Sequence, residues 1–138
     1  MTGENVELVR SIYAMLNKAY ASRELRREDF TAFYDSDVVL RTSGILREDS
    51  EHRGYDAVRD FTVDHAQAFE TTSVEPHEYI DAGDQVLVPL RYGGDARDTG
   101  INTAQYVVHV WTIRDAKVSE LVIYRKRDGA VEAVGLSR

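Results

Sequence analysis

The strongest constraint on the fold of this chain is a change in hydrophobic period after Glu70. Before that point, apolar residues recur three or four positions apart over 4–20 and over 55–70, the spacing of amphipathic helices. After it, runs rich in β-branched and aromatic residues are separated by turns that contain Gly and Asp. These runs span 72–82, 85–94, 102–115 and 117–127. Helices followed by a meander of strands predict an α+β fold, in which helices cover one face of an antiparallel sheet.

The stretch between the two long helices predicts smaller elements. Aromatic residues at helical spacing predict a short helix over 28–34, and the apolar residues 37–42 predict a strand. The polar segment 42–54 is expected to form a hairpin or an irregular flap. Pro89 lacks the N–H that a strand interior needs, so we expect a bulge or an edge position there, which would help the sheet to curve.

Size and composition suit one globular unit. The chain has 138 residues, of which 43% are hydrophobic and 30% charged, with two prolines and no repeat or low-complexity tract. We therefore expect a single domain over 1–138. Because cysteine is absent and the four histidines lack ligand spacing, we expect no metal and no cofactor.

The charge pattern limits the partners. A net charge of −7 with scattered basic residues disfavours nucleic acid. No apolar stretch has the length of a membrane span, and the first residues do not resemble a secretion signal. We expect a cytoplasmic protein that binds neither nucleic acid nor membrane.

Five segments in this order resemble the SnoaL-like family of the nuclear-transport-factor-2-like superfamily, which is also called ketosteroid isomerase-like. They are ENVELVRSIYAMLN, RGYDAVRDF, VEPHEYIDAGDQVLV, HVWTIRDAKVSELVIY and AVEAVGL, and from the first to the last they span nearly the whole chain. The resemblance implies a cone-shaped, curved antiparallel sheet, covered by N-terminal helices around an internal pocket. Segment 18–29 is longer than the usual link in this family, and its role is left open.

The superfamily contains ketosteroid isomerases, polyketide cyclases, epoxide hydrolases, dehydratases and proteins that only bind, so the fold alone does not select a function. In the isomerases, a carboxylate base and two acidic donors act on the substrate. By resemblance the base position falls on Thr42 and the second donor on His109. The tyrosine donor falls on Ile12 or, with a slip of one residue, on Tyr13. Threonine cannot remove a carbon-bound proton at neutral pH, so the usual isomerase mechanism is disfavoured.

The epoxide-hydrolase arrangement is disfavoured as well. It requires an arginine between two carboxylates, but the matching strand carries Val107 and His109 at those positions. Alternation along this strand places five residues on one side: Gln105, Val107, His109, Trp111 and Ile113. If this side faces the pocket, His109 is the predicted catalytic acid or base, and Trp111 is a flat wall for the ligand. The alternative is a hydrogen-bonded core histidine.

Five residues are predicted to bind the substrate: Tyr13, Tyr34, Thr42, His65 and Trp111. The two tyrosines are chosen because the first helix and the segment after the second helix line the cavity in the resembled fold. His65 stands on a helix face where an apolar residue is expected, so it is either a pocket donor facing the ligand or His109, or a residue bonded to nearby backbone or placed at a subunit contact.

Two functions remain open. The first is a cofactor-independent isomerase, cyclase or dehydratase that acts on a hydrophobic oxygenated molecule, with His109 as acid or base. The second is a non-catalytic protein that binds a small ligand in the same pocket. The continuous apolar run 121–124 also predicts a homodimer that forms through the sheet.

Overall fold

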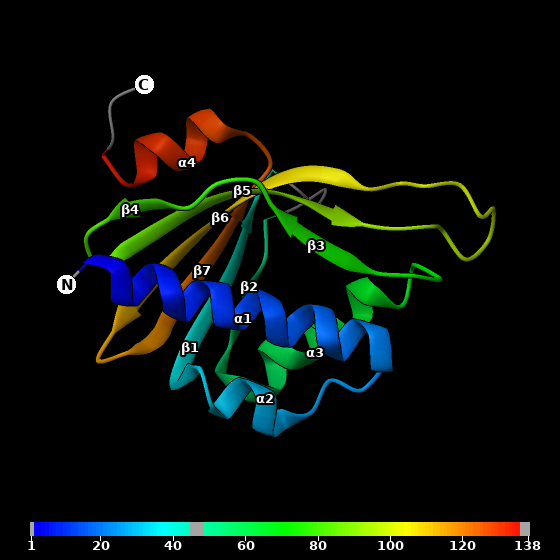
Figure 1. Ribbon diagram of the computed structural model, residues 1–138, viewed down its shortest axis with the longest axis horizontal. Coiled ribbons are helices and arrows are strands. Elements are labelled where there is room, and N and C mark those ends of the chain that lie inside the picture. The colour runs from blue at the N-terminus through cyan, green and yellow to red at the C-terminus, as the bar shows by residue number, and fades with distance from the viewer. Residues whose placement is uncertain (1, 45–48, 136–138) are drawn as a thin grey trace.

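The computed structural model describes residues 2–44 and 49–135 and contains four helices and seven strands in this part of the chain (Figure 1). In chain order the elements are α1 (Thr2–Ser22), α2 (Arg27–Thr31), β1 (Tyr34–Ser43), β2 (Glu51–Arg53), α3 (Gly54–Ala66), β3 (Ser73–Pro76), β4 (Ile80–Ala82), β5 (Gln85–Gly93), β6 (Gln105–Arg114), β7 (Lys117–Tyr124) and α4 (Arg127–Ala133). The predicted α+β class and the order of helices before the meander are confirmed.

The strands form one curved sheet in the order β2-β1-β7-β6-β5-β3, with β4 also paired to β5. Neighbours are antiparallel except for β1 and β7, which run parallel with Leu40 opposite Leu121 and Thr42 opposite Ile123. The expected antiparallel sheet is therefore observed as a mostly antiparallel one, with β1 and β7 as its parallel pair. No tight hairpin joins β1 to β7, so their direction is not constrained by a turn.

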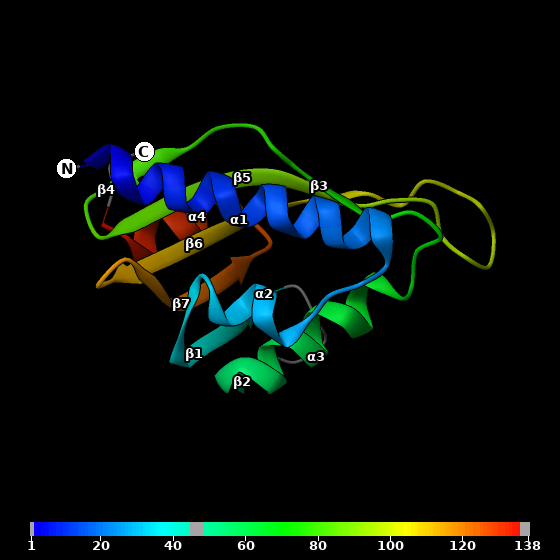
Figure 2. The same cartoon turned by 60° about the horizontal axis from the view of Figure 1, so that its bottom comes forward.

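The helices α1 and α3 cover the same face of the sheet, which is the concave one. Figures 1 and 2 show α1 crossing in front of the strands, with α2 and α3 beside β1. The buried side of α1 includes Val9, Ile12 and Leu16, which belong to the same apolar core as Val88 and Leu90 of β5. Buried residues recur every three to four positions on α1 and every second position on β5, as the helical and strand periods of the sequence predict.

The opposite face of the sheet carries α4, which the sequence patterns did not predict. Ala130 and Val131 of α4 pack on Leu87, Val108 and Val110 of β5 and β6, and Figure 2 shows the helix behind these strands. The helix covers apolar residues that alternate with the inward-facing ones. A homodimer through the sheet stays a prediction, since α4 occupies only part of this face.

Several boundaries differ from the predicted ones. The second helix ends at Thr31, and Tyr34 begins β1, because the aromatic spacing there reflects burial in both elements and not one continuous helix. The segment 42–54 does turn back as a hairpin, with β2 antiparallel to β1, although residues 45–48 lie outside the described part. The link 18–29 begins as helix, since α1 continues to Ser22.

Pro89 lies inside β5, opposite the break between β3 and β4, the two strands that pair with the same edge of β5. Its neighbours pair with β3 on one side of the break and with β4 on the other, while the His77 N–H donates to the Pro89 carbonyl over 2.9 Å. The missing proline N–H therefore falls where no regular ladder is required, which explains why the predicted strand 72–82 is split in two. Among the described residues, no helix is long and apolar enough to cross a membrane.

Candidate functional site

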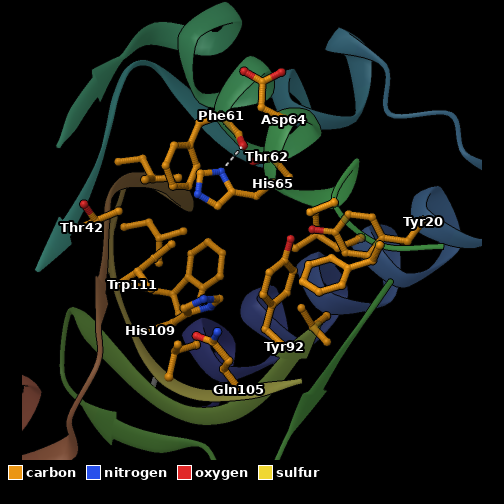
Figure 3. Close-up of a pocket in the computed structure, with 18 of the residues that line it drawn as sticks. Tyr20, Thr42, Phe61, Thr62, Asp64, His65, Tyr92, Gln105, His109 and Trp111 are labelled. Carbon is orange, nitrogen blue, oxygen red and sulfur yellow. Dashed lines mark hydrogen bonds between the residues drawn. The ribbon is translucent and has the colours of Figure 1, made fainter. Parts of the chain in front are cut away.

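A cavity of about 420 Å³ lies between the concave face of the sheet, the C-terminal half of α1 and α3 (Figure 3). Strand β6 supplies Gln105, Val107, His109 and Trp111 to its wall, as their alternation predicts. The described residues of this wall include no lysine, arginine or glutamate. Its one acidic residue, Asp64, has its carboxylate turned away from the cavity in Figure 3. Such a wall suits an uncharged, flat or apolar ligand with a few polar atoms.

Two consecutive hydrogen bonds behind the cavity wall determine which ring nitrogen of His109 carries the proton. The indole Nε1–H of Trp111 donates to the Tyr13 hydroxyl over 2.8 Å, and that hydroxyl lies 2.8 Å from Nδ1 of His109. Because an indole can only donate, the Tyr13 oxygen accepts from Trp111 and its proton points to His109. His109 Nδ1 is therefore the acceptor, and a neutral imidazole with that pattern carries its proton on Nε2.

Burial keeps both His109 and Tyr13 uncharged. Desolvation lowers the pKa of His109 from its ordinary 6.5 to about 3, and raises the pKa of Tyr13 well above 10. The sequence-based expectation was a histidine that titrates near neutrality. The structure instead holds His109 as a neutral imidazole, because the residue is only 7% exposed and burial disfavours the charged ring.

The Nε2–H group of His109 reaches the cavity. Among the described residues, every buried side-chain nitrogen or oxygen has a hydrogen-bond partner, and the bond to Tyr13 is the one that His109 makes. The nitrogen Nε2 therefore keeps some accessible surface, and His109 belongs to the cavity wall. It can donate a hydrogen bond to a ligand without being charged.

His65 of α3 shows the opposite pattern. Its Nδ1 lies 3.0 Å from the carbonyl oxygen of Phe61, one helical turn earlier, and its ring packs on the Phe61 ring at 4.0 Å. Since a carbonyl only accepts, Nδ1 is the donor, and the neutral ring carries a lone pair on Nε2. His65 also belongs to the cavity wall. His65 is thus bonded to the backbone of its own helix, as one alternative expected, and the nitrogen that it leaves free in the cavity wall is an acceptor and not the donor of the other alternative.

Three tyrosine hydroxyls of the cavity wall make no hydrogen bond within the part of the chain that the structure describes: those of Tyr20, Tyr34 and Tyr92. Burial raises the pKa of Tyr92 to about 12 and raises those of the other two, so all three remain phenols that can donate. Tyr34 was predicted from sequence. Tyr20 and Tyr92 were missed, although Tyr20 continues the apolar face of α1 and Tyr92 the inward alternation of β5 through Leu90.

Two predicted binding residues are placed differently from the expectation. Tyr13 is buried behind His109 and Trp111 and does not belong to the cavity wall, so it acts on them and not on a ligand. Thr42 belongs to the wall, but its hydroxyl is bonded to Ser50, with oxygens 2.9 Å apart and the Ser50 N–H donating to it over 3.0 Å. Thr42 therefore has neither a free hydroxyl nor a carboxylate to offer.

The two remaining histidines do not belong to the cavity wall. The His52 ring packs on the Phe61 ring with 4.5 Å between centroids, and its Nε2 is hydrogen-bonded to the Ser50 hydroxyl. His77 lies at the edge of the sheet, near Tyr106. In the described part of the chain, no three potential metal ligands lie close enough together to hold an ion.

Comparison with solved structures shows the same fold. TerC co-crystallised with polyporic acid matches with a TM-score of 0.67 and 20% identity, over 96% of this chain and 98% of TerC. A hypothetical protein from Catenulispora acidiphila with a ketosteroid isomerase-like fold, in complex with trimethylamine, gives 0.70 and 15%, over 95% and 94%. A putative polyketide cyclase from Sinorhizobium meliloti gives 0.59 and 22%, over 82% and 93%.

No curated protein matches this chain. The model of the SnoaL-like domain does match, over residues 9–121, which are most of the chain. The matched part runs from within α1 to within β7 and includes both histidines of the cavity. The match agrees with the resemblance seen in the sequence and with the curved sheet of the structural relatives. This chain belongs to the SnoaL-like domain family.

Proposed function

We propose that this protein is a cofactor-independent enzyme of the isomerase, cyclase or dehydratase type, and that its substrate is a hydrophobic molecule bearing a carbonyl oxygen. The observation that carries the proposal is the neutral Nε2–H of His109, which faces an uncharged cavity and is fixed there by Tyr13 and Trp111. A preoriented donor in a site poor in water can stabilise negative charge that develops on a substrate oxygen.

The chemistry requires a donor that remains neutral. When a proton leaves the carbon next to a carbonyl group, the negative charge moves to the carbonyl oxygen. His109 would donate a hydrogen bond to that oxygen, while Tyr34 and Trp111 would contact the rest of the substrate. In this proposal His109 acts as a hydrogen-bonding acid. It does not act as a titrating base, because its pKa of about 3 leaves it unprotonated on Nδ1 at neutral pH.

The relatives support a small organic ligand. One of them was co-crystallised with polyporic acid, a second is in complex with trimethylamine, and a third is a putative polyketide cyclase. Of these two ligands, an amine fits the present cavity less well, because its free polar groups are mostly donors: the Nε2–H of His109 and three phenol hydroxyls. Such groups prefer an acceptor oxygen.

The test uses 2-tetralone, an apolar bicyclic ketone, as a model substrate in heavy water. Deuterium entering the carbon next to the carbonyl is followed by proton NMR, and binding is followed by the emission of Trp111, the single tryptophan of the chain. We expect exchange faster than in buffer with an equal concentration of imidazole. His109→Phe, which keeps a ring but removes the donor, should slow exchange about a hundredfold. His77→Gln, at the sheet edge, is the control and should not change it.

A second function is favoured by one observation. Since His109 does not titrate near neutrality and the Asp64 carboxylate, the one acidic group among the described residues of the wall, points away from the cavity, the site can hold a carbonyl compound without transforming it. A binding protein of this kind would quench or shift the Trp111 emission with 2-tetralone and leave exchange at the buffer rate. That pair of results would replace the enzyme proposal with the non-catalytic one.

A further inference from the structure

We infer that His65 is the base of this site and that it works as a pair with His109, one imidazole accepting the substrate proton while the other donates to the substrate oxygen. The inference rests on the proposed function and adds the residue that this function lacks. It stands on the opposite hydrogen-bond patterns of the two rings and on their presence in one cavity wall.

The opposite patterns come from two different local structures. On the sheet, the Tyr13 hydroxyl donates a hydrogen bond to Nδ1 of His109, so the proton of the neutral imidazole is on Nε2, which is a donor. On α3, Nδ1–H of His65 donates a hydrogen bond to the Phe61 carbonyl, which leaves Nε2 as an acceptor. Figure 3 shows the two rings entering the cavity from its two sides, His65 from the helix and His109 from the strand.

Other groups of the cavity wall are poorer candidates for the base. The Asp64 carboxylate is directed outward, and Thr42 is bonded to Ser50. The hydroxyl of Thr62 donates back to the Val58 carbonyl, as helical threonines do. The three free phenols have raised pKa values and would have to lose their own protons first. An imidazole nitrogen with a lone pair needs no prior step.

Packing holds the His65 ring in this orientation. The centroid of the His65 ring lies 4.0 Å from that of the Phe61 ring. The Phe61 ring in turn packs on the His52 ring, with 4.5 Å between centroids. With the hydrogen bond to its own helix, His65 therefore has both a fixed tautomer and a fixed face. Preorganisation of this kind lowers the cost of placing a base at the reacting carbon.

The pair defines a complete proton transfer. Nε2 of His65 takes a proton from the carbon next to the substrate carbonyl, the electrons of that C–H bond form the C=C bond of an enolate, and the carbonyl π electrons move to oxygen. His109 stabilises the oxygen by a hydrogen bond and keeps its own proton. The imidazolium of His65 then returns the proton to another carbon in an isomerisation, or to an alkoxide after the enolate has attacked a second carbonyl in a cyclisation. No redox partner is needed.

The arrangement also defines the substrate class. The molecule must be neutral, largely apolar and able to form an enol, with its carbonyl oxygen toward β6 and the adjacent C–H toward α3. The phenols of Tyr34 and Tyr92 are free to donate to further oxygens. We therefore expect a cyclic or extended molecule with more than one carbonyl group.

The test repeats the 2-tetralone exchange with two variants of His65. His65→Asn keeps a donor that can reach the Phe61 carbonyl, and His65→Gln keeps an amide near the Nε2 position, but neither supplies an imidazole lone pair. We expect both to bind 2-tetralone like the wild type, as seen by Trp111 emission, and to exchange about a hundredfold more slowly. Two variants guard against a folding defect in one, and His77→Gln again serves as the control.

The outcomes separate this inference from the proposed function. Wild-type exchange in both His65 variants, together with a loss in His109→Phe, overturns the role of His65 and leaves the enzyme proposal standing. A wild-type protein that binds the ketone but exchanges it no faster than imidazole buffer overturns both. Independently, nitrogen-15 NMR of histidine-labelled protein should show the proton of His109 on Nε2 and that of His65 on Nδ1. The reverse tautomer at His65 would also contradict the inference.

Discussion

Acid should destabilise this protein through His109 by an amount that can be calculated. The folded pKa of about 3 lies below the ordinary 6.5, so the unfolded chain binds a proton that the folded one refuses. A lowered folded pKa on a histidine means that stability is complete above about pH 6.5 and falls as the pH decreases toward 3. At pH 5 the difference is about 1.5 pH units, and at about 1.4 kcal/mol per unit this is roughly 2 kcal/mol of unfolding free energy.

The assay is urea unfolding of the wild type and of His109→Gln at about pH 7 and about pH 5. Glutamine removes the titration and retains an acceptor for the Tyr13 hydroxyl. All carboxylates are common to both proteins and cancel in the comparison, so the wild type should lose about 2 kcal/mol more than the variant. For a slope of about 2 kcal/mol/M, that is a midpoint shift of about 1 M. Equal losses would show that His109 accepts a proton in the folded state, and the argument for a neutral donor would fail.

Two further predictions concern the scaffold of the cavity. Asn17 of α1 pairs with the backbone of Val74 like a strand neighbour, donating to its carbonyl and accepting from its N–H at 2.9 Å each, so Asn17→Ala should cost about 1–3 kcal/mol in urea unfolding and speed hydrogen exchange at the Val74 amide. A Cβ on Gly94 would lie 1.7 Å from the Thr71 carbonyl oxygen, so Gly94→Ala should cost about 3 kcal/mol or more, whereas Gly3→Ala, with nothing within 4 Å, should be neutral or slightly stabilising. A Gly94→Ala protein as stable as the wild type would contradict the close approach of these two loops.

Local periodicity was sufficient to predict most of the fold. The helices α1 and α3 and the strands β5, β6 and β7 follow from spacing, because each buries one side or alternates between two. The parallel pairing of β1 with β7 could not be predicted in this way, since register such as Leu40 opposite Leu121 is decided by packing between distant segments. The helix α4 was missed because its apolar face is short, with Ala130 and Val131 as its buried residues.

In the candidate site as well, features set by local spacing could be predicted, and features set by contacts between distant residues could not. Alternation on β6 predicts that His109 and Trp111 face the same way, and the structure places both in the cavity wall. The tautomer of His109 depends on its hydrogen bond with Tyr13, which is 96 residues away in the chain. A contact between such distant residues cannot be predicted from local spacing. Thr42 lies in the cavity wall, but the hydrogen bonds to Ser50 that occupy its hydroxyl could not be predicted from the sequence.

The assignment of roles to the two histidines follows from where each stands. His109 is buried on the concave face of the sheet, with 7% of its surface exposed, and burial disfavours the imidazolium, so this ring is suited to donate a hydrogen bond and unsuited to accept a proton. His65 lies on α3 at the side of the cavity and is half-buried. Its Nδ1–H donates a hydrogen bond to the Phe61 carbonyl, so Nε2 retains the lone pair that a base requires. A single buried histidine could not perform both parts, because the burial that makes it a neutral donor also prevents it from holding the substrate proton. If the site is catalytic, the work must therefore be divided between the sheet and the helix, and variants at the two positions should fail in different ways: His109→Phe by loss of oxyanion stabilisation, His65→Gln by loss of proton removal with binding intact.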